Sequence, residues 1–341
     1  MSTASLRAAT KRFGDTTAVD AVTLDVKDGE FVVLLGPTGA GKTTTLRLFA
    51  GLEMPDEGTV TIAGEDVTRL GPAERDVAFV FQQYSLYPHL TVYENLAFPL
   101  KAPGRKVNRA AITRRVTEIA ELLRIESKLK NRVTALSGGE MQRVSIGRAL
   151  VRAPNLFLMD EPLSSLDAKL REDLRVELKR IQRDLGATIV YVTHDQLEAM
   201  TLADRIGVLA AGRLVQVDTP RAVYETPADV YAAQRLGSPQ INLLPPDTLR
   251  VDTAPQGTAT VGVRPEDIVL RAGAANGTGV TGQVLTIEHF GVETIALVEI
   301  SGRHVHALVG PRTDFAHGTP VAATVRPGAA LYFDSAGSRL S

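Results

Sequence analysis

A glycine-rich segment near the start of the chain has the spacing of a phosphate-binding loop. It matches the pattern G-x-x-x-x-G-K-[ST], and its residues are Gly36, Pro37, Thr38, Gly39, Ala40, Gly41, Lys42 and Thr43. In such a loop, backbone N–H groups surround phosphate oxygens, and the N-terminus of the next helix favours their negative charge. Gly39 and Gly41 allow backbone conformations that side chains would obstruct. We expect Lys42 to contact the β and γ phosphates of ATP, Thr43 to offer its hydroxyl to Mg²⁺, and Thr44 to join the nucleotide site.

A second candidate feature is an apolar run, 156–159, that ends in Asp160 and Glu161. If the run is a strand of a parallel sheet, its carboxylates lie at the carboxyl edge, where the phosphate loop also lies. We expect Asp160 to help position Mg²⁺ and Glu161 to orient or deprotonate the attacking water. An isolated match of this kind would more simply be a strand entering a solvated acidic turn. The glycine loop upstream favours the catalytic interpretation.

The sequence LSGGE, which runs from Leu136 to Glu140, is typical of a capped helix start. Ser137 can cap a helix whose free N–H groups point at an anion, which would make a second phosphate-binding helix terminus together with Gly138 and Gly139. Simple capping is the alternative for Ser-Gly-Gly alone. The segment resembles the signature of ABC-type ATPases, usually written LSGGQ. Glu140 stands where glutamine is usual and adds a negative charge near the expected phosphate contact.

Further motifs similar to those of ABC ATPases follow in the family's order along essentially the whole chain. Gln82 in VFQQYSLYPHLTVYENL is similar to the Q-loop, residues 165–167 to the D-loop, and His194 in YVTHDQLEAM to the switch histidine. The resemblance implies that His194 reaches the γ phosphate, that Gln82 contacts Mg²⁺ and senses a membrane partner, and that Asp167 lines a dimer seam. A lone histidine at a strand end is more often structural, but the order of the motifs favours catalysis.

Two aromatic features are candidates for binding. Phe13 occupies the position at which the family stacks an aromatic ring on adenine, although tyrosine or tryptophan is usual there, and a core phenylalanine is the alternative. The segment 84–90, directly after Gln82, is aromatic and apolar, which suits a docking surface for a helix of another protein. Local core packing is the rival interpretation.

The elements that must position these residues form a β/α alternation. Strands are expected between Ala18 and Leu35, with helices opening near Lys42 and near Asn108. The runs 156–159 and 188–192 are expected to be buried parallel strands. This pattern predicts an α/β fold with a parallel sheet, and with the phosphate loop it predicts a P-loop NTPase. The resemblance described above implies the ABC type.

The pattern changes near the segment GSPQINLLPP, which begins at Gly237. Beyond it, short alternating runs predict strands at 261–263, 280–287, 294–300 and 321–325. We therefore expect two domains: a nucleotide-binding domain over 1–236 and a smaller all-β domain over 237–341, closed or nearly closed as a barrel. The resemblance to ABC ATPases implies that this second domain is a regulatory domain of the OB-like or TOBE kind.

Composition bounds the function. With 341 residues, the chain is longer than one hydrophobic core usually organises. Its 38 basic and 39 acidic residues nearly balance, which argues against nucleic-acid binding, and its lack of cysteine excludes disulfides, thiol catalysis and cysteine-bound metals. No apolar run approaches the roughly 20 residues that span a bilayer. We expect a cytoplasmic protein that reaches the inner membrane only peripherally, by docking on other proteins.

The resemblance also implies partners. In ABC ATPases the signature of one subunit closes over the phosphate loop of another, and this chain holds one copy of each motif. A dimer of ATPase subunits, with a homodimer as the simplest form, is therefore expected. Each composite site would combine the phosphate loop, Gln82, Asp160, Glu161 and His194 of one chain with Ser137 and Gly139 of the other.

The sequences EPLSSLDAKLR, YVTHDQLEAMTLADRI, GSPQINLL and VGVRPEDIVL resemble the ATPase subunits of maltose and glycerol-phosphate importers. The resemblance implies ATP-driven uptake of a carbohydrate or polyol through two membrane permeases and an extracytoplasmic solute-binding protein. Relatives for polyamines, sulfate or ferric iron are the nearest alternative. Soluble ABC ATPases that act on DNA or ribosomes are a more distant one, because the chain lacks their inserted coiled coils or doubled motifs.

Overall fold

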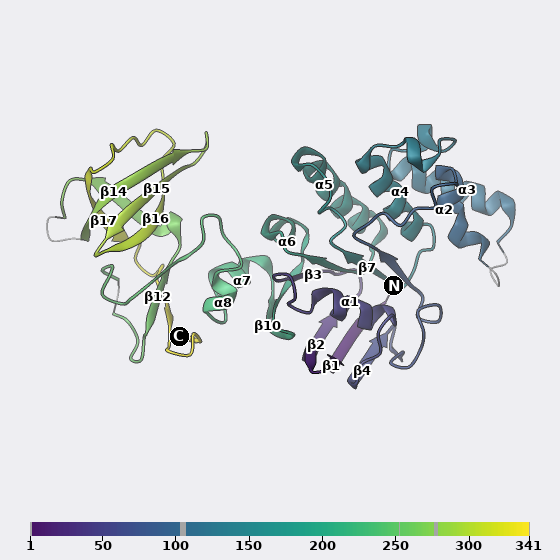
Figure 1. Cartoon of the computed structure of the whole chain (residues 1–341), viewed down its shortest axis with the longest axis horizontal. Helices are drawn as coiled ribbons and strands as arrows, with labels where there is room; N and C mark the ends of the chain where they lie inside the picture. Colours follow the sequence, from purple (N-terminus) through teal and green to yellow (C-terminus); the bar gives the residue numbers. More distant parts are fainter. Residues whose placement is uncertain (1, 103–106, 252, 276–278, 341) are drawn as a thin grey trace. The chain divides into compact units, whose positions relative to one another are not determined.

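The computed structural model of the chain describes residues 2–102, 107–251, 253–275 and 279–340. The chain forms two compact units, Met1–Pro220 and Arg221–Ser341 (Figure 1). The domain boundary between residues 236 and 237 stays a prediction, because compactness divides the chain earlier, at the start of a pair of short helices.

The first unit contains a six-stranded sheet in the order β10-β9-β3-β8-β7-β6. The pairings of β3, β6, β7, β8 and β9 are parallel, whereas β10 is antiparallel to β9. The strands are β3 (Phe31–Leu35), β6 (Val77–Val80), β7 (Leu156–Asp160), β8 (Ile189–Thr193), β9 (Arg205–Ala210) and β10 (Arg213–Asp218). Every residue of β3 and β8 is buried, as expected for parallel strands covered on both faces. The predicted parallel sheet is confirmed.

Helices follow the strands, as the β/α alternation predicts. They are α1 (Lys42–Ala50), α2 (Val92–Ala97), α3 (Arg109–Leu122), α4 (Gly138–Leu150), α5 (Ala168–Leu185) and α6 (Gln196–Leu202), with the single-turn helices η1 (Phe98–Lys101), η2 (Glu126–Lys128) and η3 (Val133–Ala135). Leu46 and Phe49 of α1 pack in one core with Val32 and Leu34 of β3, which fixes the helix that follows the glycine loop against the sheet. The helix predicted near Asn108 is confirmed, and Asn108 caps it.

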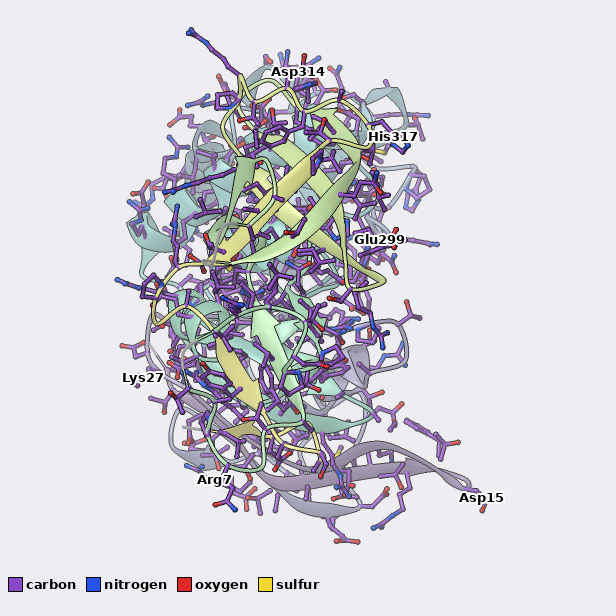
Figure 2. All side chains as sticks on the ribbon, turned by 90° about the vertical axis from the view of Figure 1, so that its left-hand side faces the viewer. Arg7, Asp15, Lys27, Glu299, Asp314 and His317 are labelled. Atoms are coloured by element: carbon purple, nitrogen blue, oxygen red, sulfur yellow. The ribbon has the colours of Figure 1, made fainter. Side chains whose placement is uncertain are left out.

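A second, antiparallel sheet of the first unit has the order β2-β1-β4-β5. Its strands are β1 (Ala4–Phe13), β2 (Thr16–Val26), β4 (Glu57–Ile62) and β5 (Glu65–Asp66). Asp15 lies at the tip of the β1–β2 hairpin, which extends outward (Figure 2). Because β1 ends at Phe13, the hairpin places this aromatic residue at its exposed end.

A buried arginine fixes the C-terminal end of α1. Arg75 is 2% exposed, and its guanidinium donates to the carbonyl oxygens of Leu48 at 2.5 Å, Leu70 at 2.9 Å and Thr68 at 3.2 Å. Burial lowers the pKa of Arg75 below its ordinary value. A cation at this end also complements the helix dipole, so Arg75 holds the helix whose other end carries Lys42.

The second unit begins with α7 (Pro220–Glu225) and α8 (Val230–Ala233) and continues as antiparallel strands. One sheet has the order β11-β12-β18-β19, with strands Asn242–Leu244, Thr260–Val263, Leu331–Phe333 and Arg339–Leu340. The other has the order β13-β17-β14-β15-β16, with strands Ile268–Ala272, Pro320–Val325, Val280–His289, Thr294–Ile300 and Arg303–Val309. Its edge strands β13 and β16 contact each other, although within the described residues no hydrogen-bonded ladder joins them. The predicted all-β architecture is confirmed.

Arg264 explains why the two short helices belong with the β strands. Its guanidinium lies 3.8 Å from the ring centre of Tyr224 in α7 and donates to the carbonyl oxygens of Ala233 at 3.1 Å and Leu236 at 2.6 Å. Arg264 is 4% exposed. Its hydrogen bonds therefore join α7 and α8 to the start of the strands within the second unit.

Within the described ranges, no helix is long and apolar enough to cross a membrane.

Candidate active site

The glycine-rich loop connects β3 to α1 and exposes its tip. Residues 37–39 are exposed, whereas Gly36 and Ala40 at their flanks are buried. Gly39 and Gly41 have φ angles of 80° and 98°, and a Cβ atom on Gly41 would collide with the carbonyl oxygen of Ala18. The two glycines are therefore required by the backbone path, as predicted. The N-terminus of α1 has no side-chain cap and no acidic residue in its first turn, so its N–H groups suit an anion.

The position of Lys42 is explained better by the binding of an anionic ligand than by stabilisation of the fold. The residue is 5% exposed and lies in the first turn of α1, where the helix dipole disfavours a cation. Its Nζ donates to the carbonyl oxygens of Gly36 at 2.9 Å and Pro37 at 3.0 Å. Glu161 Oε1 lies 3.6 Å from the same nitrogen. The ammonium group is thus held inside the loop, next to the carboxylate predicted to be catalytic.

Thr43 and Asp160 meet although they are far apart in the sequence. The Thr43 hydroxyl donates to Asp160 Oδ1 at 2.9 Å. Burial raises the pKa of the Asp160 carboxyl above its ordinary value, opposed by the Thr43 hydrogen bond and reinforced by neighbouring Glu161. A hydroxyl and a half-buried carboxylate with a second carboxylate beside it are hard oxygen donors that fit Mg²⁺.

Glu161 and His194 form the other half of the cluster. His194 Nδ1 lies 2.9 Å from Glu161 Oε2, so that the ring can donate to the carboxylate. Glu161 has a φ of 44°, a strained value for a residue other than glycine, and its N–H donates to the Val192 carbonyl at 3.0 Å. Since β3, β8 and β7 are neighbours, their carboxyl ends bring Lys42, Asp160, Glu161 and His194 to one edge.

Gln82 lies beside the segment that follows Glu161. Its Nε2 donates to Ser164 Oγ at 3.4 Å, and Ser164 in turn donates to the Glu161 carbonyl oxygen at 2.9 Å. Within the described residues, no hydrogen bond joins Gln82 to Thr43 or Asp160. Its predicted contact with Mg²⁺ therefore stays a prediction.

The LSGGE segment caps α4, as its sequence indicates. Glu140 N donates to Ser137 Oγ at 3.4 Å, and Ser137 N donates to Glu140 Oε2 at 2.9 Å, which makes a capping box. Gly139 is buried, and a Cβ atom there would collide with the Leu170 side chain of α5. The glycine therefore serves helix packing in this chain, and Ser137 and Gly138 are the more accessible members.

Two other predicted residues have definite local surroundings. Asp167 caps α5, because its Oδ1 accepts the Leu170 N–H at 3.0 Å. Phe13 is 46% exposed, with Lys11 Nζ 5.3 Å from its ring centre, so the ring is not a core residue. Its exposure leaves a face available for stacking.

The segment 84–90 lies beside a groove of about 480 Å³. All seven residues are exposed or half-buried, which local core packing does not explain. The ring centres of Tyr87 and Phe98 are 4.5 Å apart, and Arg148 donates to the Ser85 carbonyl oxygen at 2.7 Å. Other residues that line the groove include Phe79, Pro99, Ala102, Ser145 and Ala149.

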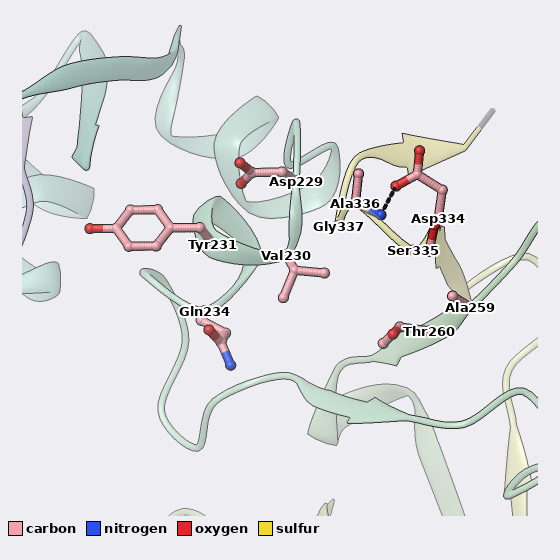
Figure 3. Close-up of a pocket in the computed structure, with 10 residues that line it drawn as sticks. All are labelled: Asp229, Val230, Tyr231, Gln234, Ala259, Thr260, Asp334, Ser335, Ala336 and Gly337. Atoms are coloured by element: carbon pink, nitrogen blue, oxygen red, sulfur yellow. Dashed lines mark hydrogen bonds between the residues drawn. The ribbon is translucent and has the colours of Figure 1, made fainter. Parts of the chain in front are cut away.

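The second unit has a groove of about 450 Å³ between α8 and the turn 334–337 (Figure 3). Asp334 Oδ1 accepts the Ala336 N–H at 2.9 Å, and Figure 3 shows the Tyr231 ring pointing away from this turn. Across the described parts of the chain, no group of three or more histidine, cysteine, aspartate or glutamate residues has the arrangement of a metal site. The groove therefore has the volume of a ligand site, but its side chains do not indicate a particular ligand.

Comparison with known proteins agrees with the two-part architecture. The model of the ABC transporter family matches residues 19–164, and that of the TOBE domain matches residues 261–333. An sn-glycerol-3-phosphate import ATP-binding protein of Rhizobium johnstonii is 47% identical over 98% of both chains. The chain belongs to the ABC transporter ATP-binding proteins. A trehalose/maltose import ATP-binding protein of Thermococcus litoralis is 55% identical over 69% of this chain and 64% of its own.

Solved ABC structures match about two thirds of the chain. The ATP-binding cassette MJ0796, solved as a dimer in a post-hydrolysis state with ADP and phosphate, is 35% identical. It covers 64% of this chain and 99% of its own length with a TM-score of 0.57. Together with the family match, this likeness identifies the chain as an ATP-binding ABC ATPase.

Some residues of the site were not predicted from the sequence. Lys128 forms an ion pair with Glu140, with Nζ and Oε1 3.0 Å apart, and Tyr84 Oη accepts from Ser165 Oγ at 3.4 Å. Tyr84 and Ser165 are far apart in the sequence, and Lys128 lies in a different element from Glu140, so no helix or strand periodicity indicates either contact. The charge of Glu140 was the one signal that called for a cationic partner.

Proposed function

We propose that this ABC ATPase couples ATP hydrolysis to the uptake of a carbohydrate or polyol. The observation that carries the ATPase chemistry is the cluster of Lys42, Thr43, Asp160, Glu161 and His194 at adjacent strand ends. The transported class follows from the relatives, whose names give sn-glycerol-3-phosphate and trehalose/maltose import.

ATP binding would start at the glycine loop. Its backbone N–H groups and the uncapped N-terminus of α1 receive the phosphates. Lys42, which is bonded to two loop carbonyls and lies near Glu161, then transfers its hydrogen bonds to phosphate oxygens. This exchange frees the Glu161 carboxylate at the moment when the nucleotide is in place.

Thr43 and Asp160 are the residues that we propose to hold Mg²⁺. Bound there, Mg²⁺ would neutralise charge on the β and γ phosphates. Asp160 needs this neutralisation, since burial and Glu161 both oppose its ionisation. Gln82 reaches this region only from the neighbouring loop, through Ser164.

Hydrolysis requires water to attack the γ phosphorus while the bond to the β–γ bridging oxygen breaks. Glu161 would orient the water and accept its proton. His194 contacts the carboxylate oxygen of Glu161 that does not face Lys42, so it would hold Glu161 in place and contact the γ phosphate. ADP and inorganic phosphate are the products.

We further propose that each site is completed by a second copy of the chain. Within the described residues, Ser137 and Gly138 make no hydrogen bond to Lys42, Thr43 or Glu161 of their own chain. A related cassette forms a dimer with ADP and phosphate bound. ATP would close the dimer seam between loop and signature, along which Asp167 would lie, and hydrolysis would release it.

The groove beside residues 84–90 is the proposed docking surface for a helix of a membrane permease. Its wall carries Tyr87 and the 47% exposed ring of Phe98, and Arg148 supplies a cation beside them. A groove with aromatic and cationic side chains, beside the segment that follows Gln82, suits a partner whose movement must reach the nucleotide site. With two permeases and an extracytoplasmic solute-binding protein, the ATPase would lie peripherally on the cytoplasmic side of the inner membrane.

The test is the ATPase rate of the complex in lipid vesicles. The chain is reconstituted with its permeases, and solute-binding protein is added with glycerol phosphate, maltose, trehalose, a polyamine, sulfate or ferric iron in turn. We expect a sugar or polyol to stimulate hydrolysis, and a Glu161→Gln complex to show none. Stimulation by a polyamine, sulfate or iron alone would overturn the assigned substrate class, and recovery of the chain with ribosomes or DNA would overturn transport.

A further inference from the structure

The N-terminus of α4 carries a charge that conflicts with its proposed role. Glu140 lies in the first turn, and its carboxylate accepts the N–H of Ser137 at 2.9 Å and lies 3.1 Å from Ser137 Oγ. The hydroxyl of Ser137 therefore faces an acceptor that is negatively charged. Phosphate oxygens that approached this helix end would be repelled by an uncompensated Glu140.

Lys128 compensates this charge from a separate segment. Its Nζ lies 3.0 Å from Glu140 Oε1, on the carboxylate oxygen that does not contact Ser137 N. The hydrogen bonds from Ser137 and Lys128 lower the pKa of Glu140, so the residue is ionised at neutral pH. Glu140 thus has one oxygen for the helix cap and one for the lysine.

The backbone holds Lys128 at this position. Its N–H donates to the Ile125 carbonyl oxygen at 2.9 Å, and its own carbonyl accepts the Asn131 N–H at 2.8 Å. Ile125 is 1% exposed, which anchors the η2 turn in the protein. The lysine is therefore presented to Glu140 by a fixed turn, and only its side chain must be ordered.

We propose that Lys128 is a positioning residue that allows a signature with glutamate to bind the nucleotide of a partner subunit. It neutralises Glu140 and retains that carboxylate in the capping box, so that Ser137 and Gly138 present a helix end without net negative charge. The proposal rests on the composite site proposed above. It also predicts that glutamine at position 140 would make Lys128 dispensable.

The experiment measures nucleotide occlusion in the full-length chain. All variants carry Glu161→Gln, and labelled ATP that resists exchange with excess unlabelled ATP is counted over a range of ATP concentrations. Lys128→Met should raise the ATP concentration for half-maximal occlusion about two- to fivefold, as expected for a partly exposed ion pair. The double variant Lys128→Met with Glu140→Gln should need nearly the same ATP concentration for half-maximal occlusion as the parent. Lys128→Arg should also resemble the parent.

Two controls separate this role from a structural one. Lys130→Met removes the same charge from the same segment and should leave occlusion unchanged. The change that Lys128→Met causes in the ATP concentration for half-maximal occlusion should be larger at low salt. The Tm of the Lys128→Met variant should match that of the parent.

Parental occlusion in Lys128→Met, or a double variant as weak as Lys128→Met, overturns the inference alone. A Glu161→Gln parent that occludes no ATP and stays monomeric during sedimentation with ATP overturns the composite site, and this inference with it.

Discussion

Replacing Glu161 by glutamine should separate ATP binding from hydrolysis. The variant keeps the shape of the side chain but removes the group that accepts the proton, and loss of general-base catalysis lowers turnover by about 10²- to 10⁴-fold. Binding should change in the opposite direction. Glu161 Oε1 lies 3.6 Å from Lys42 Nζ, so the carboxylate would compete with ATP for the ammonium group.

The size of this competition follows from the distance. At 3.6 Å, two unit charges attract by about 1 kcal/mol even at the dielectric constant of water, and more where both groups are largely buried. Without that attraction, ATP should bind about fivefold more tightly or better. Removal of the repulsion between Glu161 and the γ phosphate acts in the same direction.

Phosphate release at saturating ATP measures the first effect, and titration with a fluorescent ATP analogue measures the second. Glu172→Gln, an exposed glutamate of α5, is the matched control and should change neither. Wild-type hydrolysis by Glu161→Gln would refute the assignment of Glu161. Weaker ATP binding would refute the competition for Lys42.

Three further substitutions test separate parts of the account. Lys42→Met should abolish ATP binding and turnover, and retained turnover would contradict the role of the loop. Arg75→Met should destabilise the first unit by about 3 kcal/mol or more, because it leaves buried carbonyl groups without donors; an unchanged urea midpoint would contradict this. The folded protein raises the pKa of Asp160 above its ordinary value of 3.8. The folded state therefore loses stability relative to the unfolded state as the pH rises from about that value through the folded-state pKa. Without ligands, Asp160→Asn should therefore raise the Tm at neutral pH, and this gain should vanish below about pH 4, whereas a gain independent of pH would contradict the burial argument.

Local patterns predicted three of the six strands in the larger sheet of the first unit, β3, β7 and β8. The runs at 31–35, 156–159 and 189–192 are apolar or aromatic throughout, as is typical of a parallel sheet covered on both faces. Because those strands are parallel, their carboxyl ends lie at one edge of the sheet, which brings the glycine loop close to Asp160, Glu161 and His194. The distances among them, and the strained backbone of Glu161, depend on tertiary contacts that no local pattern encodes.

The contacts that sequence reasoning missed cross between segments. In the sequence, nothing distinguishes Lys128 from other surface charges, but η2 places it beside Glu140. Arg75 likewise has the sequence context of a loop cation, but the structure places its guanidinium against carbonyl groups at the end of α1. In the second unit, β13 and β16 were missed because Ile268–Ala272 and Arg303–Val309 mix apolar residues with arginine and histidine. Antiparallel strands with one solvated face tolerate such residues.

The central claim is that each ATP site is shared between two chains, and mixing two defective chains tests it most directly. One chain carries Lys42→Met with an intact signature, and the other carries Ser137→Arg with an intact loop; both carry Glu161→Gln. Their heterodimer contains one complete site, whereas neither homodimer contains any. The account predicts that each chain alone occludes no ATP and that the mixture occludes one nucleotide per heterodimer. Occlusion by the Ser137→Arg chain alone, or none in the mixture while the Glu161→Gln parent occludes ATP, would contradict it.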